Sequence, residues 1–364
     1  MALDTQLSRS ARAPASQREI VYTICPVLVA SNIALELGFI SEELSRVGAR
    51  ATYLRSLTEA GIWRAHYDHN HPALIRDGGN SPAIHANAAV RPTVLLGLTQ
   101  AQPAGKVVVR ADSGIYRVGD LKGRRFGIYR STNDEKIDHR RATSHRGILV
   151  TLAVHGLQPA DVEWTDVTDA DAHAEAASST PAGIWAQQGT SFEDLVPGVH
   201  THEAAALLDG RIDALYDYSV GQAELLERTG LFKIIEDLDR YPDWTLRIAN
   251  APRTLAVSRE FAQENRDIVV AYLRAVLRAG HWINDNPDAA APIFLRSTIY
   301  RDAGEIAKAL RKYDLVHSLS PQLKAGLALE KRFLLDHGYL KSDFEVEAWA
   351  DSSFLEEAAS TLAH

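Results

Sequence analysis

The chain has 364 residues, a formal net charge of −8, and 46% hydrophobic against 24% charged residues. This composition is ordinary for a globular protein and leaves enough chain for two or three domains. The acidic balance argues against nucleic acid as a partner, because nucleic-acid binding needs a basic face. No apolar run approaches the roughly 18 residues of a membrane helix, so we expect no membrane partner either.

The first 18 residues are rich in Ala, Ser, Gln and Arg and predict a flexible tail. They lack the apolar core of a secretory signal, so we expect a cytoplasmic protein. Cys25 is the only cysteine, which excludes an intrachain disulfide and disfavours a zinc site made of thiolates. Taken alone, a single cysteine is most simply a small buried apolar residue.

Strands and helices are predicted to alternate as far as residue 257, and the rest of the chain is predicted to be largely helical. Such alternation indicates an α/β protein with parallel sheets, whose ligands bind beyond the carboxyl ends of the strands. Cys25 and Tyr216 both lie at the end of a predicted strand. The predicted strands are residues 19–24, 51–57, 92–99, 106–110, 162–167, 232–235 and 255–257, with turns leading into strands at 120–128 and 209–216, and the clearest helices are residues 27–38, 146–155, 268–283, 303–313 and 321–337.

Three segments carry a resemblance to a known fold: residues 120–127 (DLKGRRFG), 209–214 (DGRIDA) and 255–261 (LAVSREF). They resemble the type II periplasmic-binding-protein fold, in the branch that includes sulfonate- and nitrate-binding proteins. The resemblance implies an α/β, two-lobed fold with a central cleft. It places lobe I at residues 19–113 plus 250–364 and lobe II at residues 114–249, after a tail formed by residues 1–18.

Two further segments narrow the resemblance: residues 22–26 (YTICP) and residues 66–79 (HYDHNHPALIRDGG). In the second, a histidine comes first, Pro-Ala stands in the middle, and Arg-x-Gly-Gly ends the segment. Both resemble motifs of the 2'-hydroxybiphenyl-2-sulfinate desulfinase-like family, in the same spacing. The resemblance implies a hydrolase that cleaves the carbon–sulfur bond of an aromatic sulfinate, releases sulfite and uses no cofactor.

The residues of these two motifs suit a sulfinate, which is an anion with two charged oxygens. The Arg76 guanidinium could donate two parallel hydrogen bonds to it, and Gly78 and Gly79 would let a backbone N–H approach closely. The resemblance makes Cys25 the reacting group, either as a nucleophile on sulfur or as the acid that protonates the ring carbon. His66 would support it by hydrogen bonding or by passing a proton.

The remaining predicted contacts concern the rest of the substrate. Thr23 keeps a hydroxyl where the family has a serine, and Tyr67 takes the place of a pocket phenylalanine. Arg146 and Tyr216 are expected to close over the substrate from lobe II. Residues 131–145 are strongly polar, unlike a pocket for biphenyl, so a smaller or more polar sulfinate is an alternative substrate.

Other interpretations of the same residues remain open. Arg76 and the two glycines would equally serve a binding protein for a sulfonate, sulfinate or similar anion, without catalysis. A related enzyme could remove another leaving group from an aromatic ring. A metal could bind His66, His69 and His71, but their spacing matches no closed set of zinc ligands, so we expect no metal.

Two last features bear on cofactors and assembly. No glycine-rich phosphate loop occurs, so a nucleotide cofactor has no support. An apolar stripe along residues 323–334 is predicted to pack within lobe I rather than against a second copy, so we expect a monomer.

Overall fold

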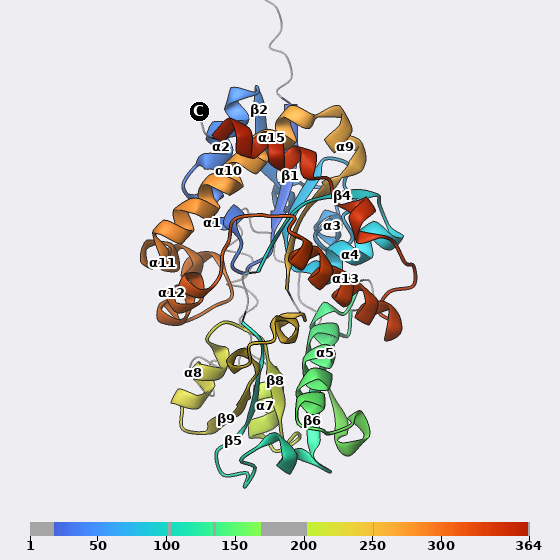
Figure 1. Cartoon of the computed structure of the whole chain (residues 1–364), viewed down its shortest axis with the longest axis vertical. Coiled ribbons are helices and arrows are strands. Elements are labelled where there is room, and N and C mark those ends of the chain that lie inside the picture. The colour runs from blue at the N-terminus through green and yellow to red at the C-terminus, as the bar shows by residue number, and fades with distance from the viewer. Residues whose placement is uncertain (1–17, 101–102, 134–135, 169–201, 250, 363–364) are drawn as a thin grey trace, which may run out of the picture.

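The structure is a computed structural model that describes residues 18–100, 103–133, 136–168, 202–249 and 251–362. Figure 1 shows two bodies stacked along the long axis, one formed by both ends of the chain and the other by its middle. The predicted tail falls outside the described residues except for Arg18, which begins the first strand. Among all the residues that the structure describes, no helix is both long enough and apolar enough to cross a membrane.

The first body is built on a five-stranded sheet with the strand order β2-β1-β3-β10-β4. Strand β1 is parallel to both β2 and β3, whereas β10 is antiparallel to β3 and β4. Every residue of β3, β4 and β10 is buried, so helices must cover both faces of this part of the sheet. The strands are β1 (Arg18–Ile24), β2 (Ala49–Tyr53), β3 (Leu74–Gly78), β4 (Thr93–Thr99) and β10 (Arg253–Ser258).

Helices pack on the two faces of this sheet and form separate apolar cores. Successive residues of β4 show the division, because Val94 and Leu96 join one core while Leu95 between them joins the other. The first core includes helices α1 (Ala30–Glu36), α2 (Phe39–Arg46), α10 (Arg266–Asp285), α11 (Pro287–Ser297), α12 (Ala303–Lys312) and α15 (Ser352–Leu362). The second core includes α4 (Asn80–Ala89), α13 (Pro321–Asp336) and α14 (Val346–Trp349), and the short helices α3 (Ala65–Asp68) and α9 (Arg259–Glu264) complete the body.

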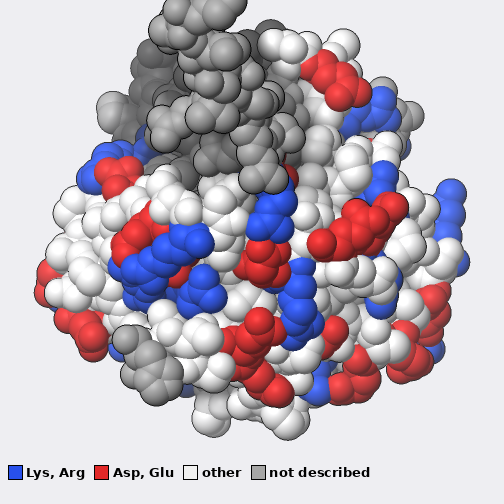
Figure 2. All heavy atoms as spheres, turned by 90° about the horizontal axis from the view of Figure 1, so that it is seen from above, with Lys and Arg blue, Asp and Glu red and all other residues white. Residues whose placement is uncertain are grey.

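Charges on the end of the first body are mixed in sign, and Figure 2 shows acidic and basic side chains interspersed over that surface. Glu43 on α2 is one of the buried acidic side chains of this body and is 1% exposed. It accepts hydrogen bonds from Arg274 at 2.9 Å and Arg278 at 2.6 Å, both on α10. Because a buried charge is costly unless it is paired, these contacts fix the position of α2 against α10.

The second body contains two smaller sheets, with the orders β8-β5-β9 and β6-β7. Strand β5 is antiparallel to both of its neighbours, and β6 is parallel to β7. Helix α5 packs against β6 and its apolar side chains join the core beneath it. The elements are β5 (Lys106–Arg110), β6 (Arg125–Arg130), β7 (Glu163–Thr168), β8 (Leu215–Asp217), β9 (Phe232–Asp237), α5 (His139–Val154), α7 (His202–Leu208) and α8 (Gln222–Arg228).

The chain passes from the first body to the second after β4, and returns before β10 through two short 3-10 helices, η6 (Leu238–Arg240) and η7 (Trp244–Arg247). The predicted boundary at residues 113 and 114 places β5 in lobe I, but both strands that pair with β5 belong to the second body. This pairing moves the first crossing to the segment between β4 and β5. The division into lobes otherwise stays a prediction.

Several helices begin at residues other than those predicted. Helix α1 starts at Ala30 rather than at residue 27, and it ends before Gly38, whose positive φ of 76° suits a glycine there. Helix α5 starts at His139 rather than at residue 146, because the side chain of Asp138 accepts a hydrogen bond from the Arg141 backbone at 3.0 Å and caps the helix. Much of the polar segment predicted as a loop is therefore the first two turns of a helix.

Candidate active site

The two motifs that carry the resemblance lie side by side because β1 and β3 are parallel neighbours. Thr23 on β1 stands opposite Arg76 on β3, so their side chains share a face of the sheet. The backbone N–H of Cys25 donates to the Asp77 carbonyl at 2.8 Å, which extends the pairing one residue past the strand. Cys25 thus lies at the carboxyl end of a parallel strand, where α/β sheets commonly bind ligands.

Four side chains form a connected hydrogen-bonded set, here named the Cys25 group: Thr23, Cys25, His66 and Arg76. The Arg76 Nη2 donates to Cys25 Sγ at 3.1 Å, and His66 Nε2 lies 3.5 Å from the same sulfur. The other ring nitrogen, His66 Nδ1, lies 2.7 Å from Thr23 Oγ1. All four side chains are at most 9% exposed, so the sulfur and the guanidinium meet in a mostly dry setting.

Most N–H groups of the Arg76 guanidinium donate hydrogen bonds to other groups of the protein. Its Nε donates to the His66 carbonyl at 2.7 Å, and its Nη1 donates to the Gly79 carbonyl at 2.8 Å. An arginine has five N–H groups, and three of these are committed here, so a bound anion would receive only the remaining hydrogens of the two Nη atoms. Two N–H groups, one on each Nη atom, therefore remain for the predicted pair of bonds to a sulfinate, while Arg76 also holds the thiol and two backbone segments.

The two glycines serve different purposes. A Cβ on Gly78 would lie 2.2 Å from Cys25 Sγ and 2.5 Å from Cys25 Cβ, so this glycine makes room for the thiol itself. Gly79 is the N-cap residue of α4, and the first residue of that helix, Asn80, is fully buried. The Nδ2 of Asn80 has no hydrogen-bond partner among the described residues. Sequence reasoning missed Asn80, although a buried amide donor at a helix N-terminus suits an anion.

The imidazole of His66 is neutral at physiological pH. Burial is the largest cause that lowers its pKa well below the ordinary value, and the cations Arg76 and Arg55 lower it further. A neutral ring has one donor and one acceptor nitrogen, so the contact with Thr23 decides which nitrogen carries the proton. If the Thr23 hydroxyl donates to Nδ1, then Nε2 carries the proton and donates to Cys25.

Tyr67 connects the Cys25 group to the second body. Its ring meets the His66 ring edge-on at 4.9 Å and stacks on the His139 ring at 5.9 Å, and Lys136 Nζ lies 4.6 Å from its centre. Burial, followed by the charges of Lys136 and Arg140, lowers the pKa of His139 to about 3. Sequence reasoning noted the polarity of this segment but did not assign these two side chains to the site, because the start of α5 was misplaced.

Arg146 and Tyr216, the two residues predicted to close over the substrate, make none of the contacts described for the Cys25 group. Arg146 Nη1 donates to the Leu329 carbonyl at 3.2 Å, and its Nε lies 3.5 Å from Glu330 on α13. The Tyr216 hydroxyl accepts the backbone N–H of Gly105 at 3.0 Å, and its ring is 5% exposed. The lobe II side chains that reach the group through Tyr67 are instead Lys136 and His139.

The histidines of the second motif point to different partners. His69 Nε2 lies 2.9 Å from the Leu74 carbonyl, and His71 Nδ1 accepts the backbone N–H of Ala73 at 3.3 Å. No three His, Cys, Asp or Glu side chains converge as metal ligands within the described ranges. The interpretation of this histidine cluster as a metal site gains no geometric support.

Comparison with known proteins supports both resemblances. A family model described as NMT1/THI5 like matches residues 172–290. The chain is 28% identical over 363 residues to 2'-hydroxybiphenyl-2-sulfinate desulfinase of Rhodococcus erythropolis, and 92% of each chain is covered. The resemblance predicted from the two motifs is thus confirmed over nearly the whole length.

Solved structures show the same fold. A mutant of the enzyme DszB in complex with biphenyl-2-sulfinic acid superposes with a TM-score of 0.75 at 25% identity, covering 95% of this chain and 99% of that one. A putative periplasmic sulfonate-binding protein, SsuA from Methylobacillus flagellatus KT, gives a TM-score of 0.66 at 17% identity, with 95% of each chain covered. The predicted type II periplasmic-binding-protein-like fold is confirmed.

Proposed function

We propose that this chain is a desulfinase that cleaves the carbon–sulfur bond of an aromatic sulfinate and releases sulfite, with Cys25 as its reacting group. The observation that carries the proposal is the meeting of Arg76 Nη2 and Cys25 Sγ at 3.1 Å, at the end of two parallel strands. A relative that matches nearly the whole chain is a sulfinate desulfinase, and the solved DszB mutant binds biphenyl-2-sulfinic acid. An anion-binding protein with this fold would not need a thiol in contact with a guanidinium.

The overall reaction consumes one water and changes no oxidation state. The electron pair of the carbon–sulfur bond stays with the ring carbon, which takes up a proton to give the arene. The sulfur leaves as sulfur dioxide and adds water to become sulfite. If Cys25 acts as the acid, its S–H proton goes to the ring carbon, and water restores the thiol.

If Cys25 acts as the nucleophile, its sulfur bonds to the sulfinate sulfur while the aryl group departs and is protonated. Water then cleaves the new sulfur–sulfur bond and returns thiol and sulfite. Both routes place negative charge on Cys25 Sγ, and Arg76 and His66 are positioned to stabilise it by donating hydrogen bonds. Asn80 Nδ2 offers a buried donor for a sulfinate oxygen.

The polar side chains that pack on Tyr67 favour a substrate whose aromatic ring carries a polar or anionic substituent. Lys136 and His139 pack on the Tyr67 ring, and the same ring meets the His66 ring edge-on, so a cation lies close to the Cys25 group. We expect a carboxylate-bearing sulfinate, such as 2-carboxybenzenesulfinate, to be turned over with a higher kcat/KM than biphenyl-2-sulfinate. The reverse order would contradict this preference but not the desulfinase activity itself.

The test of the activity is sulfite release from a panel of aryl and alkyl sulfinates, measured for the wild type and for Cys25→Ser. We expect sulfite from at least one aryl sulfinate with the wild type and none above background with Cys25→Ser. Isothermal titration of the same sulfinates into Cys25→Ser should still detect binding. Binding without sulfite release from the wild type would instead establish an anion-binding protein.

A further inference from the structure

A pocket of about 290 Å³ lies beside the two segments that cross between the bodies. Gln100 directly follows β4 and Pro252 directly precedes β10, so both crossings contribute to its wall. Trp244 and Arg247 come from η7 of the return segment, while Tyr313 and Gly326 come from the C-terminal part of the chain. No member of the Cys25 group lines this cavity, here named the hinge pocket.

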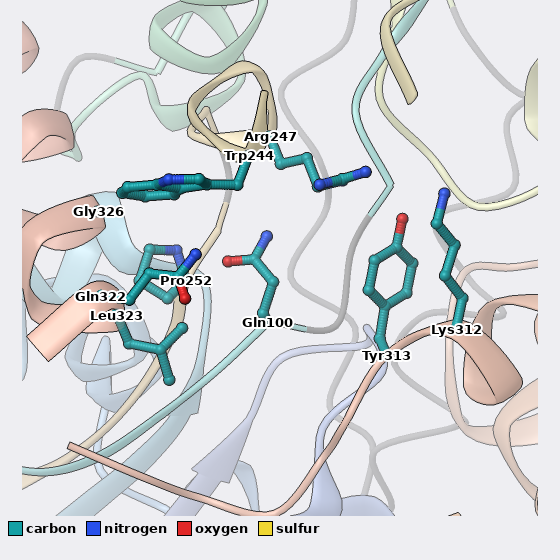
Figure 3. A pocket seen from close by; sticks show the side chains of 9 residues that line it. All are labelled: Gln100, Trp244, Arg247, Pro252, Lys312, Tyr313, Gln322, Leu323 and Gly326. Carbon is teal, nitrogen blue, oxygen red and sulfur yellow. The ribbon is translucent and has the colours of Figure 1, made fainter. Parts of the chain in front are cut away.

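One side of the hinge pocket is apolar and shaped for a flat group. The indole of Trp244 stands above Pro252 and Leu323, and Figure 3 shows its ring edge-on over the cavity. A Cβ placed on Gly326 would lie 3.4 Å from both Trp244 and Pro252, so the missing side chain keeps the indole close to α13. An exposed face of tryptophan beside small apolar side chains is a usual platform for an aromatic ring.

The other side of the hinge pocket carries two cations that share one carboxylate. Arg247 Nε donates to Asp239 at 3.0 Å, Lys312 Nζ also pairs with Asp239, and the Tyr313 hydroxyl lies 3.1 Å from both of its oxygens. Although burial opposes ionisation, hydrogen bonds from Lys312 and Arg247 hold the pKa of Asp239 below its ordinary value. The three charged groups therefore sum to one positive charge, which a single anionic group would balance.

A polar donor also faces the cavity. In Figure 3 the amide of Gln100 projects into the space between Trp244, Arg247 and Tyr313. Its Nε2 is buried and has no hydrogen-bond partner among the described residues. A buried amide N–H without a partner destabilises the fold relative to a satisfied one, so a ligand that accepts a hydrogen bond from it is favoured.

We propose that the hinge pocket is a second ligand site, which binds a small aromatic monoanion such as a benzoate-like carboxylate. The ring lies on Trp244, and the anionic group is held by Arg247 and Lys312 with Gln100 as an additional donor. The site does not depend on the proposed desulfinase activity, because it shares no residue with the Cys25 group. Its ligand contacts both crossing segments and the first body, so binding restrains the hinge that joins the two bodies.

Two tryptophans of this chain can report on the two sites separately. Trp244 belongs to the hinge pocket, whereas Trp63 packs against Tyr67 at 5.7 Å and so lies beside the Cys25 group. The indole N–H signals of the 15N-labelled full chain are assigned with Trp244→Phe and Trp63→Phe. Benzoate, benzamide and benzylammonium are then titrated in turn.

Benzoate should shift the Trp244 signal saturably, and benzamide should bind about fivefold more weakly, as expected for the loss of one partly exposed ion pair. Benzylammonium should leave the Trp244 signal unchanged. The proposal is overturned if benzoate shifts only the Trp63 signal, or if the three probes act on Trp244 alike.

Variants of the pocket separate its two halves. Lys312→Gln should weaken benzoate severalfold and leave benzamide unaffected, whereas Gly326→Leu should abolish both by filling the space in front of Trp244. Gly326→Ala is the matched control, because its Cβ would stand at ordinary contact distance, and it should bind as the wild type does. Unchanged benzoate affinity in folded Lys312→Gln would refute the anion site.

Discussion

The two halves of the candidate active site are built in different ways. On the lobe I side, Cys25, His66 and Arg76 are joined directly by hydrogen bonds at 3.5 Å or less. On the lobe II side, Lys136 and His139 reach the site by packing on the Tyr67 ring. The register of two strands fixes the first half, which holds the proposed reacting group. The second half depends on how the bodies dock, and we propose that it selects the substrate.

The largest expected difference is between two arginines: Arg76, which is buried in the first body, and Arg146, which is partly buried in the second. Arg76→Gln leaves the carbonyls of His66 and Gly79 without a donor, so we expect the free energy of unfolding to fall by about 2–4 kcal/mol. We also expect kcat/KM for sulfite release to fall by about a thousandfold or more, since Cys25 loses a charged donor.

Arg146→Gln is the matched control for Arg76→Gln. Burial raises the pKa of Glu330 to about 8 despite the nearby Arg146, so this carboxyl is protonated at pH 7 and does not require the guanidinium charge. We expect kcat/KM to stay within about tenfold of the wild type, as for residues outside the reacting group. Equal losses of turnover in the two variants would show that the site extends to Arg146.

Gly78→Ala tests the close packing beneath the thiol. The added Cβ would lie 2.2 Å from Cys25 Sγ, which forces the sulfur away from Arg76 and His66. We expect activity to fall by about a hundredfold and stability by about 1–3 kcal/mol. Gly119→Ala is the control, because its nearest neighbour would be a flexible arginine side chain at 3.8 Å, and sulfite release should be unaffected.

Acidification should destabilise the lobe I half through its buried imidazoles. Burial lowers the pKa of His69 to about 3, so below pH 6.5 the unfolded chain binds a proton that the folded chain does not. The free energy of unfolding should therefore fall as pH drops from 6.5 towards 3, by about 1.4 kcal/mol per pH unit for this residue.

Urea unfolding at pH 7, 6 and 5 measures this loss in the wild type and in His69→Asn. Asparagine cannot titrate in this range, and it tolerates the positive φ of 59° that His69 adopts. The variant should lose less stability than the wild type between pH 7 and 5. Parallel losses would mean that other groups account for the acid sensitivity.

The smallest expected effect concerns the lobe II half. Lys136→Gln should lower kcat/KM about fivefold for 2-carboxybenzenesulfinate and leave benzenesulfinate unchanged, because only the first substrate carries a carboxylate that can pair with Lys136. Steady-state sulfite release from both substrates measures the ratio. A uniform drop for both would assign Lys136 to the reacting centre instead of to substrate selection.

The sequence predicted the lobe I half because its residues occur in two short motifs on adjacent strands. Strand 106–110 was also predicted with its exact bounds, since an uninterrupted run of valines has one simple explanation. The start of α5 was missed by seven residues, because the capping role of Asp138 competes with a run of polar residues that resembles a loop. His139 and Lys136 could not then be placed near Tyr67.

The hinge pocket left no signal in the sequence. Its residues lie between positions 100 and 326, and no two of its segments form a recognisable motif. Asn80 shows the same difficulty at a smaller scale, since only the folded chain reveals that its amide is buried without a partner. Such features depend on how separate elements pack, and a single sequence does not record that packing.

Strand β10 directly connects the hinge pocket with the residues that pack against the sulfur of Cys25. Pro252 lines the pocket, and two residues later the Thr254 hydroxyl donates to the Gly78 carbonyl at 3.4 Å. Two residues of extended chain span only about 7 Å. A tilt of β10 at its first residues would therefore shift the Gly78 peptide, which packs against Cys25. Directed evolution of the hinge pocket could then change the rate of the proposed reaction without replacing any side chain that contacts the substrate.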